Sequence, residues 1–359
     1  MKIVIDCRFI SASGLGTYLK GCLPYFLSSP HKFILVGDTE KLHCFVAGKS
    51  NYEIINCSIK PFSLNELFLF PDSLKKIINS ADLYYSPYFN IPSGINVPVY
   101  TTIHDIIFPD VPELTSKVGL TARMWFYKRA FKLSKKIFTV SNFSKSRIEH
   151  YSHKKVPIIV TYIALQSYLL TKRELPVVKK DMILFIGNIK KHKGLDCLFE
   201  AFLLARAEGL LHKLIIVGSR DNFRTTDNSF LQKIDSIAPD SVTFTGFISD
   251  DKLSEYLSEA SLLVQPSLYE GFGLPPLEAM VSGTYALISD IPVFKEIYDG
   301  FPVTFFRAGD VNDLKEKLLD ILLDKSARTL SLSEDLVNKY NFQKTSEIIL
   351  RNLSLDFSE

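Results

Sequence analysis

The 359-residue sequence contains no apolar run near the roughly 18 residues that a membrane-spanning helix needs. Its five cysteines are scattered, odd in number and without C-x-x-C spacing, which argues against both a disulfide framework and a zinc site. Charged residues at Lys2, Asp6 and Arg8 interrupt any apolar core of a signal peptide. We therefore expect a cytoplasmic protein in a reducing compartment.

Acidic residues are missing from one long stretch. Between Glu113 and Glu149 there is none, whereas nine lysines and arginines occur there, interleaved with aromatic residues that include Trp125, the only tryptophan. A basic, aromatic helix over residues 117–136 is typical of an element that lies on an anionic membrane surface, here the inner face of the cell membrane. The alternative is a helix whose aromatics pack on a sheet while its lysines stay in water. Nucleic acid is not expected, because the net charge is only +3 and no recognition motif accompanies the patch.

Short β-rich runs alternate with amphipathic helical segments along most of the chain, and the alternation restarts near residue 180. Such alternation predicts parallel sheets with helices on both faces, and the length is large for one core. We therefore predict an α/β protein with two doubly wound, Rossmann-like domains, residues 1–165 and 166–341, and a final helical segment at 342–359. The join is expected within residues 164–180.

The expected strands are 2–6, 33–36, 52–57, 83–85, 97–104, 137–141, 157–162, 182–187, 213–217, 242–245, 261–264, 285–288 and 303–306. The expected helices are 17–27, 73–78, 117–133, 144–151, 194–207, 230–237, 250–259, 276–281, 311–323 and 342–353.

The strongest chemical signal is the segment Ser267–Gly283, SLYEGFGLPPLEAMVSG. A predicted strand precedes it, and Pro275 and Pro276 suit the first turn of a helix. Glu270 then lies just past the carboxyl end of the strand, and Glu278 lies one turn inside the helix. The backbone amides between them would point outward beside the positive end of the helix dipole. This pattern predicts a site for a phosphorylated ligand that is rich in hydroxyl groups.

Two further motifs follow predicted strands of the first half, where open parallel sheets bind ligands. Gly14 and Gly16 would let the backbone turn tightly before a helix near Thr17, although an ordinary turn is an equal alternative and the spacing is not that of dinucleotide folds. His104, beside Asp105, could bond a substrate hydroxyl or stabilise a developing charge. A histidine that bonds only local backbone is the alternative.

In the second half, the segment Gly187–Gly194, GNIKKHKG, places cations after a strand and a glycine turn. Lys193, with Lys190 or Lys191, could neutralise a diphosphate. A cluster of solvated lysines is the alternative, and the placement favours function at Lys193.

Together these motifs resemble those of family 4 retaining glycosyltransferases, which have the GT-B fold: two Rossmann-like domains that face each other across a cleft. The resemblance extends over nearly the whole chain and rests mainly on the Glu270-x7-Glu278 pair and on His104-Asp105. Further segments similar to family motifs are 5–8, 84–92, 139–145, 187–194 and the C-terminal helix, which in the family crosses back onto the N-terminal domain.

The resemblance implies a role for each motif. Glu278 would bind the ribose hydroxyls, Glu270 would contact the donor sugar, and Lys193 would stabilise the leaving diphosphate. His104 would touch the donor sugar. The loop of Gly14 and Gly16 would border the acceptor and the phosphate. The remaining donor-binding candidates are Gly187, Asn188, Lys190 and the backbone amides of Phe272, Gly273 and Leu274.

One residue departs from the family pattern. Many members carry arginine after the glycine of the lysine motif, where this chain has Asn188. The second positive charge on the diphosphate is therefore open, and Lys190 is our candidate.

The implied reaction is the retaining transfer of a sugar from a nucleoside-diphosphate donor, GDP-mannose or a UDP-sugar, to a saccharide acceptor. A lipid-linked acceptor, as in surface polysaccharide assembly, follows if the basic helix contacts the membrane. Glu270 would attack the sugar, or the acceptor would enter on the face that the leaving group quits; analogy favours the second route. Fixed cations and amides make a metal unnecessary, and we expect neither a metal site nor another cofactor.

Two rival functions remain. A sugar-nucleotide epimerase or a phosphorylase is not expected to carry the glutamate segment. A bilobal binding protein without chemistry predicts export, which the N-terminal sequence does not support.

Overall fold

The computed structural model describes residues 1–46, 48–153, 155–166, 169, 178–218, 241–323, 330 and 334–357. The chain divides into two units, Met1–Gln166 with Tyr340–Glu359, and Ser167–Lys339. The expected helix over 230–237 and most of the expected join at 164–180 lie outside the described residues.

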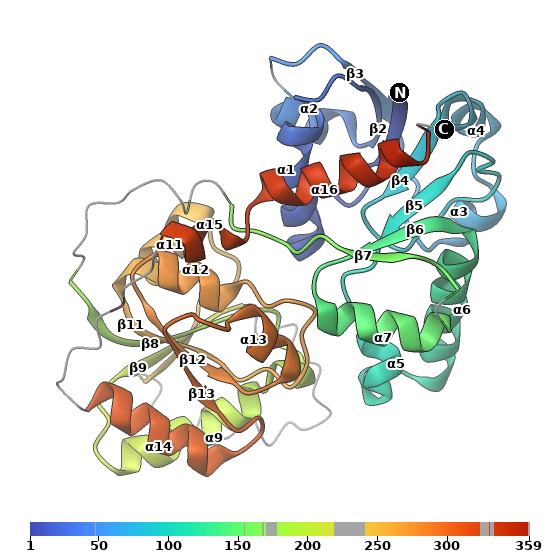
Figure 1. Ribbon diagram of the computed structural model, residues 1–359. Helices are drawn as coiled ribbons and strands as arrows, with labels where there is room; N and C mark the ends of the chain where they lie inside the picture. The colour runs from blue at the N-terminus through green and yellow to red at the C-terminus, as the bar shows by residue number, and fades with distance from the viewer. Residues whose placement is uncertain are drawn as a thin grey trace. The chain divides into compact units, whose positions relative to one another are not determined.

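The N-terminal unit is built on a seven-stranded parallel sheet in the order β3-β2-β1-β4-β5-β6-β7 (Figure 1). Because β1 pairs with both β2 and β4, the direction of winding reverses between β1 and β4. The strands are β1 (Lys2–Asp6), β2 (Lys32–Gly37), β3 (Tyr52–Asn56), β4 (Leu83–Ser86), β5 (Val99–Thr102), β6 (Ser134–Thr139) and β7 (Ile158–Val160).

Helices flank this sheet on both faces. They are α1 (Ser13–Phe26), α2 (Thr39–Val46), α3 (Leu64–Phe68), α4 (Asp72–Asn79), α5 (Ile107–Asp110), the 3-10 turn η1 (Pro112–Leu114), α6 (Lys117–Leu133), α7 (Asn142–Ser152) and α16 (Phe342–Leu355). The last helix, red in Figure 1, lies along α1, in blue. The side chain of Asn341 caps its first turn by accepting from the Lys344 amide.

The second unit repeats the plan with a six-stranded parallel sheet in the order β10-β9-β8-β11-β12-β13. The strands are β8 (Lys180–Ile186), β9 (Lys213–Val217), β10 (Val242–Phe244), β11 (Ala260–Gln265), β12 (Tyr285–Ser289) and β13 (Val303–Phe306). Its helices are η2 (Lys191–Lys193), α9 (Leu195–Ala207), α11 (Asp250–Glu259), α12 (Pro275–Val281), α13 (Pro292–Ile297), α14 (Val311–Leu322) and α15 (Glu334–Lys339). Here the winding reverses between β8 and β11, which pair in parallel.

Each unit has its own apolar core, and the predicted pair of doubly wound α/β sheets is confirmed. One expected strand, 97–104, shortens to β5. Ile103 still donates to the Phe138 carbonyl of β6, whereas the His104 side chain bonds the Pro87 carbonyl. The helix expected near Thr17 begins at Ser13, so Gly14 and Gly16 form part of its first turn and not a loop before it.

Candidate active site

The second sheet brings Lys193 and Glu270 together where its winding reverses. Lys193 follows β8 and Glu270 follows β11, and these strands are neighbours. The Lys193 Nζ lies 2.6 Å from Oε1 and 2.8 Å from Oε2 of Glu270. Ligands of doubly wound folds bind at such a reversal, beyond the carboxyl ends of the strands. The position of this ion pair therefore indicates a binding site for a polar ligand.

The loop after β8 is held against the loop after β11 by close backbone packing. Gly194 has a φ of 65°, and a Cβ there would lie 1.9 Å from the Pro266 carbonyl oxygen, so only glycine fits. The Leu268 amide donates to the His192 carbonyl at 2.8 Å. These contacts fix Lys193 next to Glu270.

His192 adds no positive charge to the lysines of this loop, because it is neutral near pH 7. Burial, with the Lys193 charge adding, lowers the pKa of His192 to about 4. Asn188 and Lys190 are both exposed, and Gly187 continues the sheet by donating to the Val217 carbonyl. Lys190 is thus available to a ligand, and its role as the second cation stays a prediction.

A serine hydroxyl also anchors the carboxylate of Glu270. The Ser267 hydroxyl donates to Oε1 at 2.7 Å, and the Gln265 amide donates to the same hydroxyl at 3.0 Å. Hydrogen bonds to an ionised group are stronger than neutral ones, so this chain fixes the orientation of Glu270. Ser267 lies in the segment that the sequence singled out, but only the fold shows that it touches Glu270.

The turn between the two glutamates is also fixed. Gly273 has a φ of 84°, and a Cβ there would lie 2.4 Å from Cε1 of Phe294. The Tyr298 hydroxyl donates to the Gly273 carbonyl and accepts from the Leu277 amide. Tyr298 was not predicted, since nothing in its local pattern pairs it with a glycine 25 residues earlier.

Helix α12 begins at Pro275, one residue earlier than expected, and carries Glu278 in its first turn. Burial, with the Asp250 charge adding, raises the pKa of Glu278 to about 7. The Phe272 side chain is buried, whereas Gly273 and Leu274 are partly exposed. A carboxyl group that is part acid and part carboxylate near neutral pH can both donate to and accept from hydroxyl groups.

His104, Gly14 and Gly16 belong to the N-terminal unit, at the carboxyl ends of β5 and β1. His104 Nε2 lies 3.0 Å from the Pro87 carbonyl, and burial lowers its pKa to about 4. Since the carbonyl only accepts, Nε2 carries the proton and Nδ1 is left as an acceptor. The ring packs edge-on against the Tyr18 ring, with 4.7 Å between the ring centroids. The local backbone contact of the alternative interpretation thus exists, and a role in the reaction stays a prediction.

Comparison with known proteins gives the following matches. A family model described as glycosyl transferases group 1 matches residues 170–339. O-antigen chain mannosyltransferase B of Escherichia coli is 28% identical over 272 residues, which are 72% of this chain and 70% of that protein. O-antigen chain mannosyltransferase RfbU of Salmonella typhimurium is 31% identical over 253 residues, 69% of this chain and 67% of that protein.

Two solved structures are similar over the whole length. Sucrose-phosphate synthase from Thermosynechococcus elongatus aligns with a TM-score of 0.75 at 18% identity, covering 100% of this chain and 99% of that one. Anabaena HepE in complex with UDP and glucose aligns with a TM-score of 0.74 at 17% identity, covering 99% of each chain. At these identities the likeness concerns the fold.

Proposed function

Since this chain belongs to the group 1 glycosyltransferases, we propose that it transfers a sugar from a nucleoside-diphosphate donor to a saccharide acceptor with retention and without a metal ion. The full-length likeness to solved structures, with two doubly wound sheets, confirms the predicted GT-B fold. One observation carries the proposal: the ion pair of Lys193 and Glu270 at the reversal of the second sheet.

The chemistry of the pair matches the charges of the reaction. Departure of a nucleoside diphosphate builds negative charge on phosphate and positive charge on the anomeric carbon. Lys193 supplies a fixed cation for the first, and Glu270 supplies a fixed carboxylate beside it for the sugar. Preorganised charges of this kind contribute a large part of catalysis. They support transfer without a metal, because the ammonium group already stabilises the leaving diphosphate.

The same geometry favours a same-face transfer, in which the acceptor attacks from the side that the diphosphate leaves. It disfavours a covalent sugar intermediate on Glu270. Both oxygens of Glu270 lie within hydrogen-bond distance of Lys193, and one of them also accepts from Ser267. A carboxylate engaged in this way is a weak nucleophile. We therefore propose that the acceptor enters on the face that the diphosphate leaves, and that the departing phosphate takes the acceptor proton.

GDP-mannose is the proposed donor, because the two relatives named above are mannosyltransferases. UDP-sugars are the second candidates, since HepE holds UDP and glucose on a similar fold. The O-antigen names support a lipid-linked saccharide acceptor and a place in surface polysaccharide assembly. Among the described residues, no helix combines the length and the apolar character needed to cross a bilayer. We propose that the protein works in the cytoplasm on the inner face of the membrane, which its basic segment 117–136 contacts.

Product analysis with a panel of sugar nucleotides tests the proposal. We expect release of GDP from GDP-mannose, undiminished by EDTA, and an α-linked product from the α-linked donor. Lys193→Met should lower turnover by about 10²–10³-fold. Lys213→Met, at an exposed position where β9 begins, on the opposite edge of the sheet from the site, is the matched control and should leave turnover unchanged.

Three outcomes would contradict the proposal: an inverted anomeric centre, loss of activity with EDTA, or equal effects of the two lysine variants. A sugar-nucleotide epimerase would convert the donor without releasing a nucleoside diphosphate, and a binding protein would leave it intact.

A further inference from the structure

Helix α3 exposes two of its three apolar residues and buries its charged one. Leu64 and Phe68 are each 72% exposed, and Leu69, which follows the helix, is 71% exposed. The buried residue of α3 is Glu66. A surface helix of a soluble protein normally has the opposite arrangement, with the apolar stripe on the core and the charges in water.

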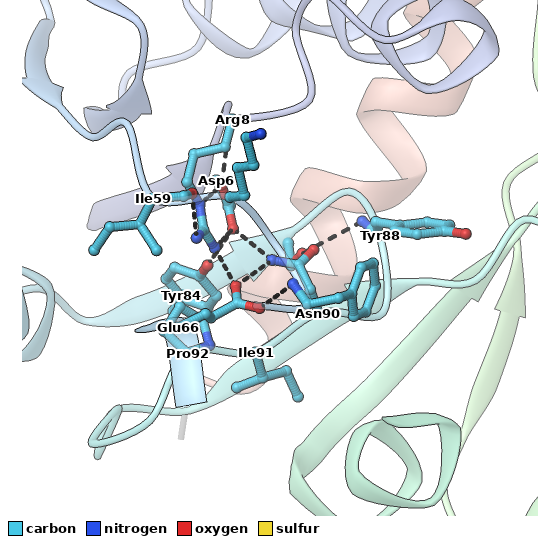
Figure 2. Close-up of polar contacts among 12 residues, drawn as sticks. Asp6, Arg8, Ile59, Glu66, Tyr84, Tyr88, Asn90, Ile91 and Pro92 are labelled. Atoms are coloured by element: carbon cyan, nitrogen blue, oxygen red, sulfur yellow. Dashed lines mark hydrogen bonds and ion pairs between the residues drawn. The ribbon is translucent and has the colours of Figure 1, made fainter. Parts of the chain in front are cut away.

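Glu66 is held in the interior by a network of polar contacts (Figure 2). Its Oε1 lies 2.6 Å from Nη2 of Arg8 and accepts from the Asn90 amide at 3.0 Å. Its Oε2 accepts from the Phe62 backbone amide at 2.5 Å. Arg8 in turn binds Asp6 through Nε and Nη2, at 2.9 and 2.6 Å. The side chains of Arg8, Asp6 and Glu66 are almost completely buried.

This network fixes the orientation of α3. Turning the helix to hide Leu64 and Phe68 would withdraw Glu66 from Arg8 and leave charges buried without partners, which proteins tolerate poorly. The outward direction of the apolar side chains is therefore part of the folded structure, and a partner outside this chain would have to cover them.

Contacts join α3 to α6, the basic helix of this unit. The Phe62 ring, just before α3, packs on the Phe126 ring of α6 with 4.8 Å between ring centroids. The Phe126 and Trp125 centroids are 5.0 Å apart. Arg129 of α6 bonds the Pro92 carbonyl, next to Ser93, whose amide donates to the Glu66 carbonyl. Figure 1 draws both helices on the same side of the N-terminal unit.

Apart from Thr121, the exposed residues of α6 are basic or apolar. Trp125 is 50% exposed, Lys128 and Lys132 are exposed, and the sequence from 114 to 148 contains no acidic residue. Exposed apolar residues flanked by cations match the two layers of an anionic membrane surface, its acyl boundary and its headgroups.

We propose that Leu64, Phe68 and Leu69 insert into the interfacial layer of an anionic lipid bilayer while Lys128 and Lys132 contact its headgroups. These five residues form the docking surface. The inference extends the membrane contact proposed for segment 117–136 by assigning the insertion to a different element, α3, whose orientation depends on Glu66.

Vesicle binding tests this without any sugar transfer. Vesicles of equal parts phosphatidylcholine and phosphatidylglycerol should bind the protein, and the triple variant Leu64→Ser, Phe68→Ser, Leu69→Ser should bind about 10- to 100-fold more weakly. Lys128→Gln with Lys132→Gln should weaken binding about fivefold per lysine and remove much of its salt dependence. The matched control is Phe247→Ser, since Phe247 is 99% exposed in the other unit.

The single tryptophan gives a second readout. Trp125 emission should shift to the blue when these vesicles are added to the wild-type protein, and shift less in the triple variant. Unchanged binding in the triple variant, or equal binding to pure phosphatidylcholine, would overturn the proposal. Self-association lost in the triple variant, with no vesicle binding, would instead identify a second copy as the occupant.

The transferase assay separates this inference from the proposed function. The triple variant should keep full activity on a water-soluble acceptor saccharide. If wild-type protein binds vesicles but transfers no sugar, the proposed function fails alone.

Discussion

Glu270 and Glu278 stand eight positions apart and lie in opposite electrostatic surroundings. Glu270 is paired with Lys193 and accepts from Ser267. For Glu278, burial raises the pKa to about 7, and the nearby Asp250 charge adds to the rise. The first group is suited to holding a fixed charge, and the second can exchange a proton when a ligand arrives.

We predict that Glu278→Gln removes a pH-dependent loss of stability. Because the folded-state pKa of Glu278, about 7, lies above its ordinary value of 4.5, its contribution is fully present below about pH 4.5 and disappears as the pH rises through 7. The variant, which cannot ionise, should therefore gain about 3 kcal/mol relative to wild type between these limits.

Urea unfolding of both proteins at several pH values, followed by hydrogen exchange of peptides from the second unit, measures this difference, in which the titration of other groups cancels. A difference in free energy of unfolding that stays constant from pH 4.5 to 8 would contradict the prediction. The same substitution should weaken nucleotide binding if Glu278 holds the ribose.

Much of the candidate site could be predicted from the sequence, because its main residues directly follow strands. Glu270 and Lys193 come after β11 and β8, and parallel strands place their carboxyl ends at one edge. Ser267 and Tyr298 could not be predicted, since their partners are chosen by packing. The roles of the site residues stay predictions.

At the scale of elements, predictability follows length. The 17-residue α6 and the 10-residue α11 were predicted with their observed bounds, because several turns reveal a period. The five-residue α3 and the four-residue α5 are too short to show one, and neither was predicted. The start of α1 was misplaced because glycines usually disfavour a helix, whereas here the tertiary structure overrides that preference.

Helix α3 supports a prediction that reverses the usual rule for apolar residues. Glu66→Ala should cost about 3–5 kcal/mol of stability, because it leaves part of the Arg8 network buried without a partner. Leu64→Ala should change stability by less than about 0.5 kcal/mol, since the leucine side chain is exposed.

Denaturant unfolding followed by Trp125 fluorescence reports these effects on the N-terminal unit, where the only tryptophan lies. A larger loss from Leu64→Ala than from Glu66→Ala would show that the network does not fix this element.

In the whole molecule, helix α16 belongs to the N-terminal unit, although it follows the second unit in sequence. Thr345 of α16 donates to the Thr161 carbonyl at 3.0 Å, and Asp356, just past α16, accepts from Tyr100 at 2.7 Å. Lys136 lies 3.0 Å from the Asp356 carboxylate. Helical periodicity predicted α16, but its attachment to the first sheet followed only from the family resemblance, because periodicity shows which face is apolar and not what covers it.

We therefore predict that a cavity in α16 destabilises the N-terminal unit, although the two are distant in sequence. Ile349 is completely buried, so Ile349→Ala should cost about 2–4 kcal/mol. Glu347→Ala, at an exposed position of the same helix, is the matched control and should change stability little. Each unit has its own core, so one free energy does not describe the whole chain. Hydrogen exchange resolved by peptide provides the measurement: protection should fall in β1, β4 and β5, and remain in β8, β11 and β12. Equal losses in both sets would mean that α16 supports the chain as a whole and not the first unit.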